Sequence, residues 1–169
     1  MTDYKYLGNF PLFRELMEQE LNLVHSIIHI KNFEAGSKIF EEGEAGQEMY
    51  ILLEGEIEIT KPLTLLKDKP GSREGDNMAL IRLKAEEFPS VGEMALFGDN
   101  DQRSATVTVK RASRFGVIEK NGFLQLAEKN PALGYKVMRN LAHIMGERLK
   151  KANQDILKLT TAFTLALQE

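Results

Sequence analysis

Hydrophobic and polar residues alternate along the middle of the chain, in short runs separated by glycine. The runs cover residues 28–33, 38–40, 49–53, 56–60, 79–83, 106–109 and 114–118. Alternation with a period of two predicts strands that each bury one face. Many short strands with glycine turns between them favour a barrel or jelly roll. Glu54-Gly55, between two of the runs, predicts a tight hairpin.

The segments on either side of these runs have helical rather than alternating spacing. Apolar residues from Pro11 to Ile28 recur at mostly helical intervals, which predicts an N-terminal helix. Residues 61–78 are polar, contain two prolines and two glycines, and predict a long hairpin loop. Residues 121–128 suit a short helix. We therefore predict a β domain with its N-terminal helix over residues 1–129, followed by a helical segment over 130–169.

This last segment predicts one long helix over residues 131–167. Asn130-Pro131 is typical of a helix start, and no proline follows. Apolar residues then recur three or four apart, at Leu141, Met145, Leu149, Ala152, Ile156, Leu159, Phe163 and Ala166. At about 1.5 Å per residue the helix would be about 55 Å long, more than one small domain can cover. We expect its outer half to pair with a second copy of the chain, and docking on a different protein is the alternative.

Composition and charge narrow the classes of partner. The 169 residues carry a formal net charge of −3, which argues against nucleic acid as the main partner. There is no cysteine, so no disulfide framework is expected. The N-terminus has no apolar signal core, and no apolar run approaches the length that spans a bilayer. We expect a cytoplasmic protein that does not contact a membrane.

Residues 90–109 contain the groups most suited to binding a ligand. Gly92 allows a close backbone approach, and a helical turn over residues 93–97 would direct its first N–H groups at an anion. Arg103 supplies a planar, charged fork that matches two phosphate oxygens. Glu93 would repel a phosphate. It is suitable if the ligand also offers a hydroxyl donor, as a ribose does.

The spacing of Gly92-Glu93, Arg103-Ser104 and the strand that follows resembles the phosphate-binding segment of the cyclic nucleotide-binding domain family. The glycines that separate the preceding strands fit the same family, so the resemblance covers roughly residues 12–150. It implies an eight-stranded antiparallel β-roll, or jelly roll, flanked by an N-terminal helix and a long C-terminal helix. It further implies that Glu93 binds the ribose hydroxyl and that Arg103 binds the cyclic phosphate. Ser104 and the backbone N–H groups of Met94 and Ala95 would assist.

The resemblance also implies where the base lies and which nucleotide binds. Asn153, next to Ala152 on the long helix, falls where the family reads the base, and Ser104 is similar to bacterial sensors of cyclic AMP. Cyclic AMP is therefore the predicted ligand, and cyclic GMP remains possible. Other interpretations stay open. Glu93 could be a solvated carboxylate or a helix N-terminal acid, Arg103 could pair with Asp99 or Asp101, and Asn153 could be an exposed or dimer-seam residue.

Other functions lack their signatures. No phosphate-loop motif is present, and no histidine accompanies a candidate nucleophile in the strand-rich part. His25 and His29 lie four residues apart without a third strong ligand nearby, so no metal site is expected. The sequence shows no DNA-binding module after the long helix. We predict a non-enzymatic cyclic nucleotide sensor acting through an unknown effector, either stand-alone or as a fragment of a longer protein. A ligand-free protein-interaction module is the alternative.

Overall fold

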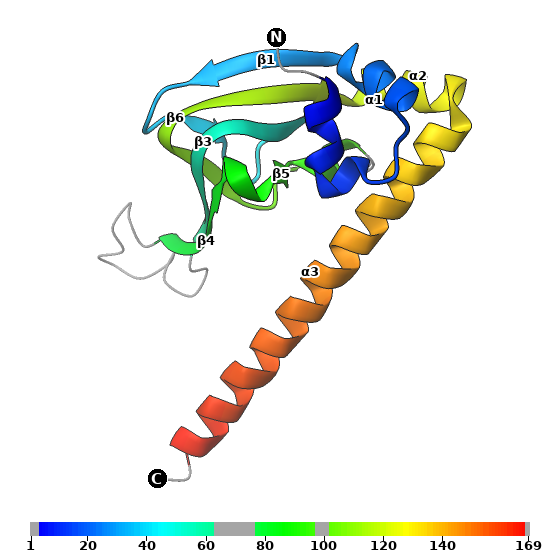
Figure 1. The fold of residues 1–169 in the computed structure, drawn as a ribbon. Helices are drawn as coiled ribbons and strands as arrows, with labels where there is room; N and C mark the ends of the chain where they lie inside the picture. Colours follow the sequence, from blue (N-terminus) through cyan, green and yellow to red (C-terminus); the bar gives the residue numbers. More distant parts are fainter. Residues whose placement is uncertain (1–3, 63–76, 97–101, 168–169) are drawn as a thin grey trace.

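A computed structural model describes residues 4–62, 77–96 and 102–167 of the chain. Its strands form one antiparallel sheet in the order β1-β6-β3-β4, with β2 paired to β6 and β5 paired to β3 (Figure 1). The strands are β1 (Ile28–Phe33), β2 (Lys38–Phe40), β3 (Glu48–Pro62), β4 (Asn77–Lys84), β5 (Ser90–Val91) and β6 (Thr106–Glu119). The sheet curls on itself, so the predicted antiparallel β-roll is confirmed.

The structure describes six strands, whereas the resemblance implied eight. Of the seven alternating runs, two merge into β3 and two into β6, and the short strand β5 was not among the runs. The hairpin predicted at Glu54-Gly55 was wrong. β3 runs through Gly55 and pairs with β6 on both sides of it, with register shifts on the way. Gly55 has a φ of 102°, and a Cβ there would lie 2.0 Å from the Oγ of Ser113. The glycine therefore allows a bulge that bends a continuous strand.

Alternation along β3 divides the core into two clusters. Met49, Ile51 and Leu53 pack beneath the helices, in the cluster that also contains Phe10, Phe123 and Val137. The intervening Tyr50 and Leu52 point into the roll, where they pack with Phe40, Val107 and Phe115. Successive side chains of a strand point to opposite faces, and here both faces are covered.

The N-terminal helix is shorter and more broken than predicted. Two 3-10 turns, η1 (Tyr4–Asn9) and η2 (Pro11–Phe13), precede α1 (Glu18–His25). Glu15 has a φ of 64°, which interrupts helical geometry between the turns and α1. The carboxylate of Glu20 then accepts the backbone N–H of Met17 at 2.7 Å and caps the first turn of α1.

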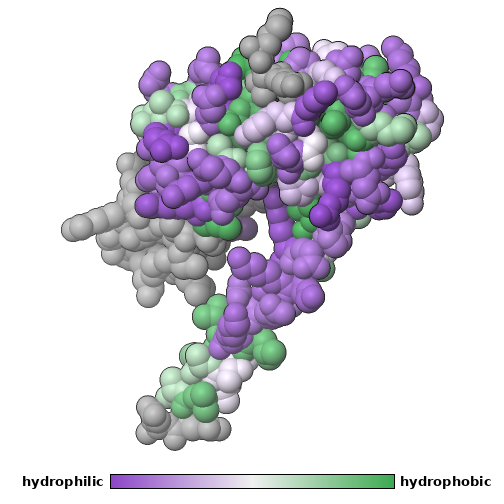
Figure 2. Space-filling model, in the orientation of Figure 1, coloured by the Kyte–Doolittle hydropathy of each residue, from purple (hydrophilic) through white to green (hydrophobic). Residues whose placement is uncertain are grey.

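The long helix is present, and its two halves have different surroundings. After η4 (Ala85–Glu87), η5 (Glu93–Leu96) and α2 (Lys120–Lys129), α3 covers Pro131–Ala166. Its first turns are buried at Leu133, Val137 and Leu141, and the Asn140 amide donates to the carbonyls of Leu12 and Arg14. From Gly146 to Leu167 every residue is exposed. This half extends away from the roll, and its outer end is apolar (Figures 1 and 2).

Two sequence predictions concern segments that lie outside the described residues. Most of the predicted loop between β3 and β4 falls at 63–76, and Asp99 and Asp101 fall at 97–101. Within the described ranges, no helix combines the length and apolar character that a membrane crossing requires.

Candidate ligand-binding site

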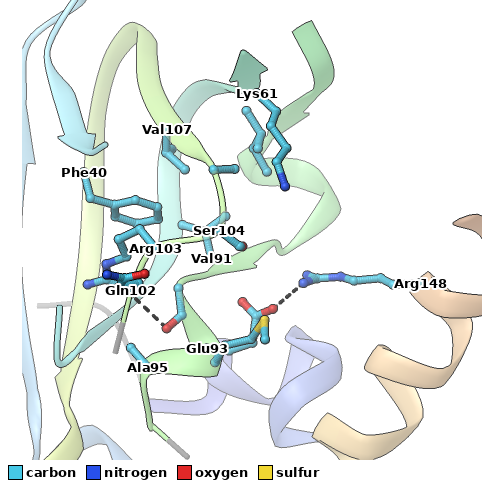
Figure 3. Close-up of a pocket in the computed structure, with 14 residues that line it drawn as sticks. Phe40, Lys61, Val91, Glu93, Ala95, Gln102, Arg103, Ser104, Val107 and Arg148 are labelled. Carbon is cyan, nitrogen blue, oxygen red and sulfur yellow. Dashed lines mark hydrogen bonds and ion pairs between the residues drawn. The ribbon is translucent and has the colours of Figure 1, made fainter. Parts of the chain in front are cut away.

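A cavity of about 320 Å³ lies between the open end of the roll and α3 (Figure 3). This volume is at the lower end of the range typical of small-molecule sites. The cavity contains six of the seven predicted ligand residues, namely Gly92, Glu93, Met94, Ala95, Arg103 and Ser104. Apolar side chains from the sheet, including Phe40, Ile59 and Val107, complete its inner surface.

Arg103 is fixed just before β6 and is only 7% exposed. Its guanidinium carbon lies 4.3 Å from the centroid of the Phe40 ring, and Nη1 donates to the carbonyl of Gly92 at 3.4 Å. A Cβ at Gly46 would lie 2.3 Å from its Nε and Nη2. Glu44 and Gly43 hold its backbone in two hydrogen bonds of 2.8 Å. The arginine fork is therefore held in position by ring stacking, a carbonyl and a glycine.

The carboxylate of Glu48 contributes to the electrostatic environment of Arg103. Burial raises the pKa of Glu48. Hydrogen bonds from Lys31 and Tyr50, together with the charges of Lys31 and Arg103, lower the pKa by more than burial raises it. The net pKa lies below its ordinary value, so Glu48 is anionic at neutral pH. Burial, together with the hydrogen bond to Glu48 and its charge, raises the pKa of Tyr50. Tyr50 therefore stays a neutral hydrogen-bond donor.

The segment after β5 forms the floor of the cavity. Gly92 adopts a φ of 74°, and a Cβ there would lie 2.5 Å from Nη1 of Arg103. The predicted helical turn is a single 3-10 turn, η5. Within it the Ala95 N–H donates to the Gly92 carbonyl at 3.1 Å, so this predicted phosphate donor is already used by the turn. Met94 is 61% exposed.

Glu93 is buried and links the sheet to α3. Its side chain is 4% exposed, which excludes the solvated carboxylate considered from the sequence. Oε1 accepts a charge-assisted hydrogen bond from Nη1 of Arg148 on α3 (Figure 3). Nη2 of Arg148 donates to the Ser90 carbonyl at 3.4 Å. Oε2 is buried and has no hydrogen-bond partner among the described residues. An unpaired buried carboxylate oxygen is costly, so Oε2 is suited to accept a hydrogen bond from a ligand.

The sequence did not indicate Arg148, which lines the cavity. It indicated Asn153, which the structure places outside the cavity. Arg148 lies 55 residues from Glu93 along the chain, and no local motif pairs the two. Asn153 does not line the cavity. It is exposed on α3 in a shallow surface groove beside Leu149 and Leu157. Among the residues that the structure describes, no three histidine or carboxylate side chains cluster as a metal site requires.

Comparison with known proteins assigns this architecture to a family. The family described as "Cyclic nucleotide-binding domain" matches residues 30–130, and the chain belongs to it. That stretch contains all six predicted residues that line the cavity. Arg148 and the rest of α3 lie beyond it.

Individual relatives support the same class. The chain is 28% identical over 128 residues to the cAMP-activated global transcriptional regulator CRP of Salmonella typhimurium, covering 76% of this chain and 54% of that protein. It is 28% identical over 155 residues to Glutaminase 1 of Bradyrhizobium diazoefficiens, covering 92% of this chain but only 22% of that protein. The chain thus spans between a fifth and about half of these relatives. The activity in the name Glutaminase 1 is that of the other protein, of which the match covers 22%.

Solved structures agree on the fold. The Catabolite Activator Protein of Thermus thermophilus superposes with a TM-score of 0.71 at 25% identity, covering 89% of this chain and 63% of that one. A cyclic nucleotide-binding domain from Methylobacillus flagellatus superposes with a TM-score of 0.73 at 21% identity, covering 91% and 84%. The second likeness concerns the fold alone.

Proposed function

We propose that the chain is a sensor for a cyclic nucleotide, with cyclic AMP as its ligand, and that binding changes the placement of α3. The observation that carries the proposal is that one cavity contains a buried, fixed arginine, Arg103, and a buried carboxylate oxygen, Oε2 of Glu93, that accepts no hydrogen bond from any described residue. A cyclic nucleotide offers a matching pair of groups, an anionic phosphate and a ribose hydroxyl. Similarity to CRP, which is described as cAMP-activated, favours the adenine nucleotide.

Each group of the ligand then has a residue to bind. The phosphate binds Arg103, with the hydroxyl of Ser104 as a further donor, because a charged fork gives the strongest fixed anchor. The ribose hydroxyl donates to Oε2 of Glu93, while Oε1 keeps Arg148. Glu93 would thus connect the ligand to α3 through one carboxylate. The ligand would then favour one placement of α3 over others, which is a shift in population.

A second copy of the chain would explain the position of Asn153. The heptad seam at Leu149, Ile156 and Phe163 favours a parallel homodimer through the outer half of α3. Arg148 and Asn153 lie at the flanking g and e positions of such a seam, five residues apart. In a parallel pair these positions face each other across the interface, so Asn153 of the second copy would lie beside Arg148. From there its amide could both donate to and accept from a purine edge.

The test is calorimetric titration of protein that has been refolded to remove any carried-over nucleotide. We expect cyclic AMP to bind with micromolar or higher affinity, accompanied by a rise in melting temperature, with cyclic GMP as the comparison ligand. The absence of both heat and thermal shift with either nucleotide would contradict the proposal. The β-roll would then be considered a ligand-free protein-interaction module.

A further inference from the structure

The cavity contains a third cation that neither the sequence motif nor the ion pair to α3 uses. Lys61 lies near the end of β3 and lines the cavity. Ile59 and Lys61 are two residues apart on the strand and face the cavity together, since strand side chains alternate. Because Ile59 pairs with Val107 and Thr60 pairs with Thr106, Lys61 is in register with the segment that enters β6 after Ser104.

The charge of Lys61 is available to a ligand. Arg103 donates to Gly92 and stacks on Phe40, and Arg148 pairs with Glu93. Lys61 is exposed, and no described residue forms a hydrogen bond or an ion pair with its Nζ. Figure 3 shows its side chain extending into the space between Ser104 and Arg148. The ammonium group of a lysine sits on a flexible four-carbon stem, so it can reorient toward a bound group.

The position of Lys61 relative to the two anchors determines which part of a nucleotide it would meet. This step rests on the proposed function. If the phosphate binds Arg103 and the ribose binds Glu93, the base takes the remaining lining of the cavity. This lining includes Ile59, Val107 and Lys61, together with Phe40, Val91, Ala105 and Gln102, and Figure 3 shows Gln102 beside Arg103. Ile59 and Val107 offer apolar contact to the face of a ring, and Lys61 is the charged side chain of this remaining lining.

We infer that Lys61 reads the edge of the base and raises the affinity for cyclic GMP relative to cyclic AMP. An ammonium group donates hydrogen bonds and cannot accept them. Guanine presents two adjacent acceptors, O6 and N7, whereas adenine presents the N7 acceptor beside an N6 amino donor. Lys61 can therefore donate to both positions of guanine but only to one of adenine. Its effect opposes the adenine preference that the family likeness at Ser104 implies, so discrimination between the two nucleotides should be weak.

The experiment compares affinity ratios in the 169-residue chain by calorimetric titration with three probes, namely cyclic AMP, cyclic GMP and cyclic IMP. Cyclic IMP has the O6 and N7 acceptors of guanine without its 2-amino group. We expect Lys61→Met to lower the ratio of cyclic GMP to cyclic AMP affinity by about threefold to tenfold, and cyclic IMP to follow cyclic GMP. The loss is below that of a buried bidentate contact because Lys61 is exposed.

Two control variants separate base reading from general electrostatics. Lys61→Arg keeps a donor for O6 and N7 and should leave the ratio near that of the original chain. Lys84→Met removes an exposed charge that does not line the cavity and should change neither affinity. Equal weakening of all three nucleotides by Lys61→Met, or an unchanged ratio, would overturn the inference. If the original chain bound none of the three, the proposed function itself would fail.

Discussion

The two sides of the cavity position their arginines in different ways. On the sheet side, Arg103 is 7% exposed, stacks on Phe40 and occupies space that only a glycine at position 46 leaves open. On the helix side, the Arg148 side chain is 52% exposed and lies near the start of the half of α3 in which every residue is exposed. The first arginine is held before any ligand arrives, whereas the second keeps much of its freedom.

Because of this difference, we expect one side of the cavity to determine ligand affinity and the other to determine how α3 responds to the ligand. A preorganised group binds its ligand with little loss of conformational entropy, so the sheet side should supply most of the binding free energy. A contact made by an exposed side chain on a projecting helix can be exchanged at low cost. The helix side should therefore determine how the molecule responds. Changes on the two sides, ordered by their expected effect on ligand affinity, test this division.

Arg103→Ala should have the largest effect. It removes the one fixed cation expected at the phosphate and should cost roughly 2–5 kcal/mol of binding free energy. Titration with cyclic AMP measures the loss, and Arg111→Ala, at an exposed position of β6, is the matched control. An affinity within twofold of the original chain, in a variant that still melts cooperatively, would rule out Arg103 as the anchor.

The sequence could indicate Arg103 and Glu93 because both lie within one short segment that has recognisable spacing. The surroundings of Arg103 could not be predicted in the same way. Phe40 and Gly46 come from a distant part of the chain, and only the curled sheet places them beside it. The same limit applies to Arg148, which reaches Glu93 only because α3 passes the edge of the roll.

Gly46→Ala tests whether the preorganisation of Arg103 matters when every ligand group remains. A Cβ at this position would lie 2.3 Å from the guanidinium, so Arg103 must shift. We expect a loss of about tenfold in nucleotide affinity, smaller than for removal of the arginine, because the charge remains near the site. Titration measures this loss. Gly122→Ala is the control, since no atom lies within 4 Å of its added Cβ. Equal affinities for both variants would contradict the preorganised anchor.

Strand boundaries also depend partly on neighbouring residues in the sequence and partly on contacts between distant segments. The alternating runs at β1, β2 and β4 were located from the sequence because each run ends at residues that break the pattern. At Gly55 the local signal, a glycine between two apolar runs, is the same for a hairpin and for a bulge. Pairing of β3 with β6 on both sides of Gly55 decides for the bulge, and that pairing is a long-range contact.

Arg148→Ala should affect ligand affinity less and the unliganded fold more. Without Arg148 the buried Glu93 carboxylate loses its described partner, so the free energy of unfolding should fall by about 1–3 kcal/mol. Affinity for cyclic AMP should change by less than about tenfold, because Arg103 is untouched. Thermal melting and titration measure the two quantities, and hydrogen exchange of α3 measures the ligand response, which should shrink. Lys151→Ala, a nearby exposed charge on α3, is the control. A loss as large as that of Arg103→Ala would place the main anchor on the helix.

The smallest effect on the cavity is expected from the outer half of α3, where two similarly exposed leucines provide a matched pair. Leu159 is 71% exposed and lies in the heptad seam, whereas Leu157 is 68% exposed and lies outside it. Neither lines the cavity, so alanine at either position should leave nucleotide affinity within about twofold. Sedimentation velocity over a range of protein concentrations should show weaker self-association for Leu159→Ala and little change for Leu157→Ala. Equal behaviour of the two variants would mean that the seam does not pair two copies, and that α3 meets a different partner through a broader face.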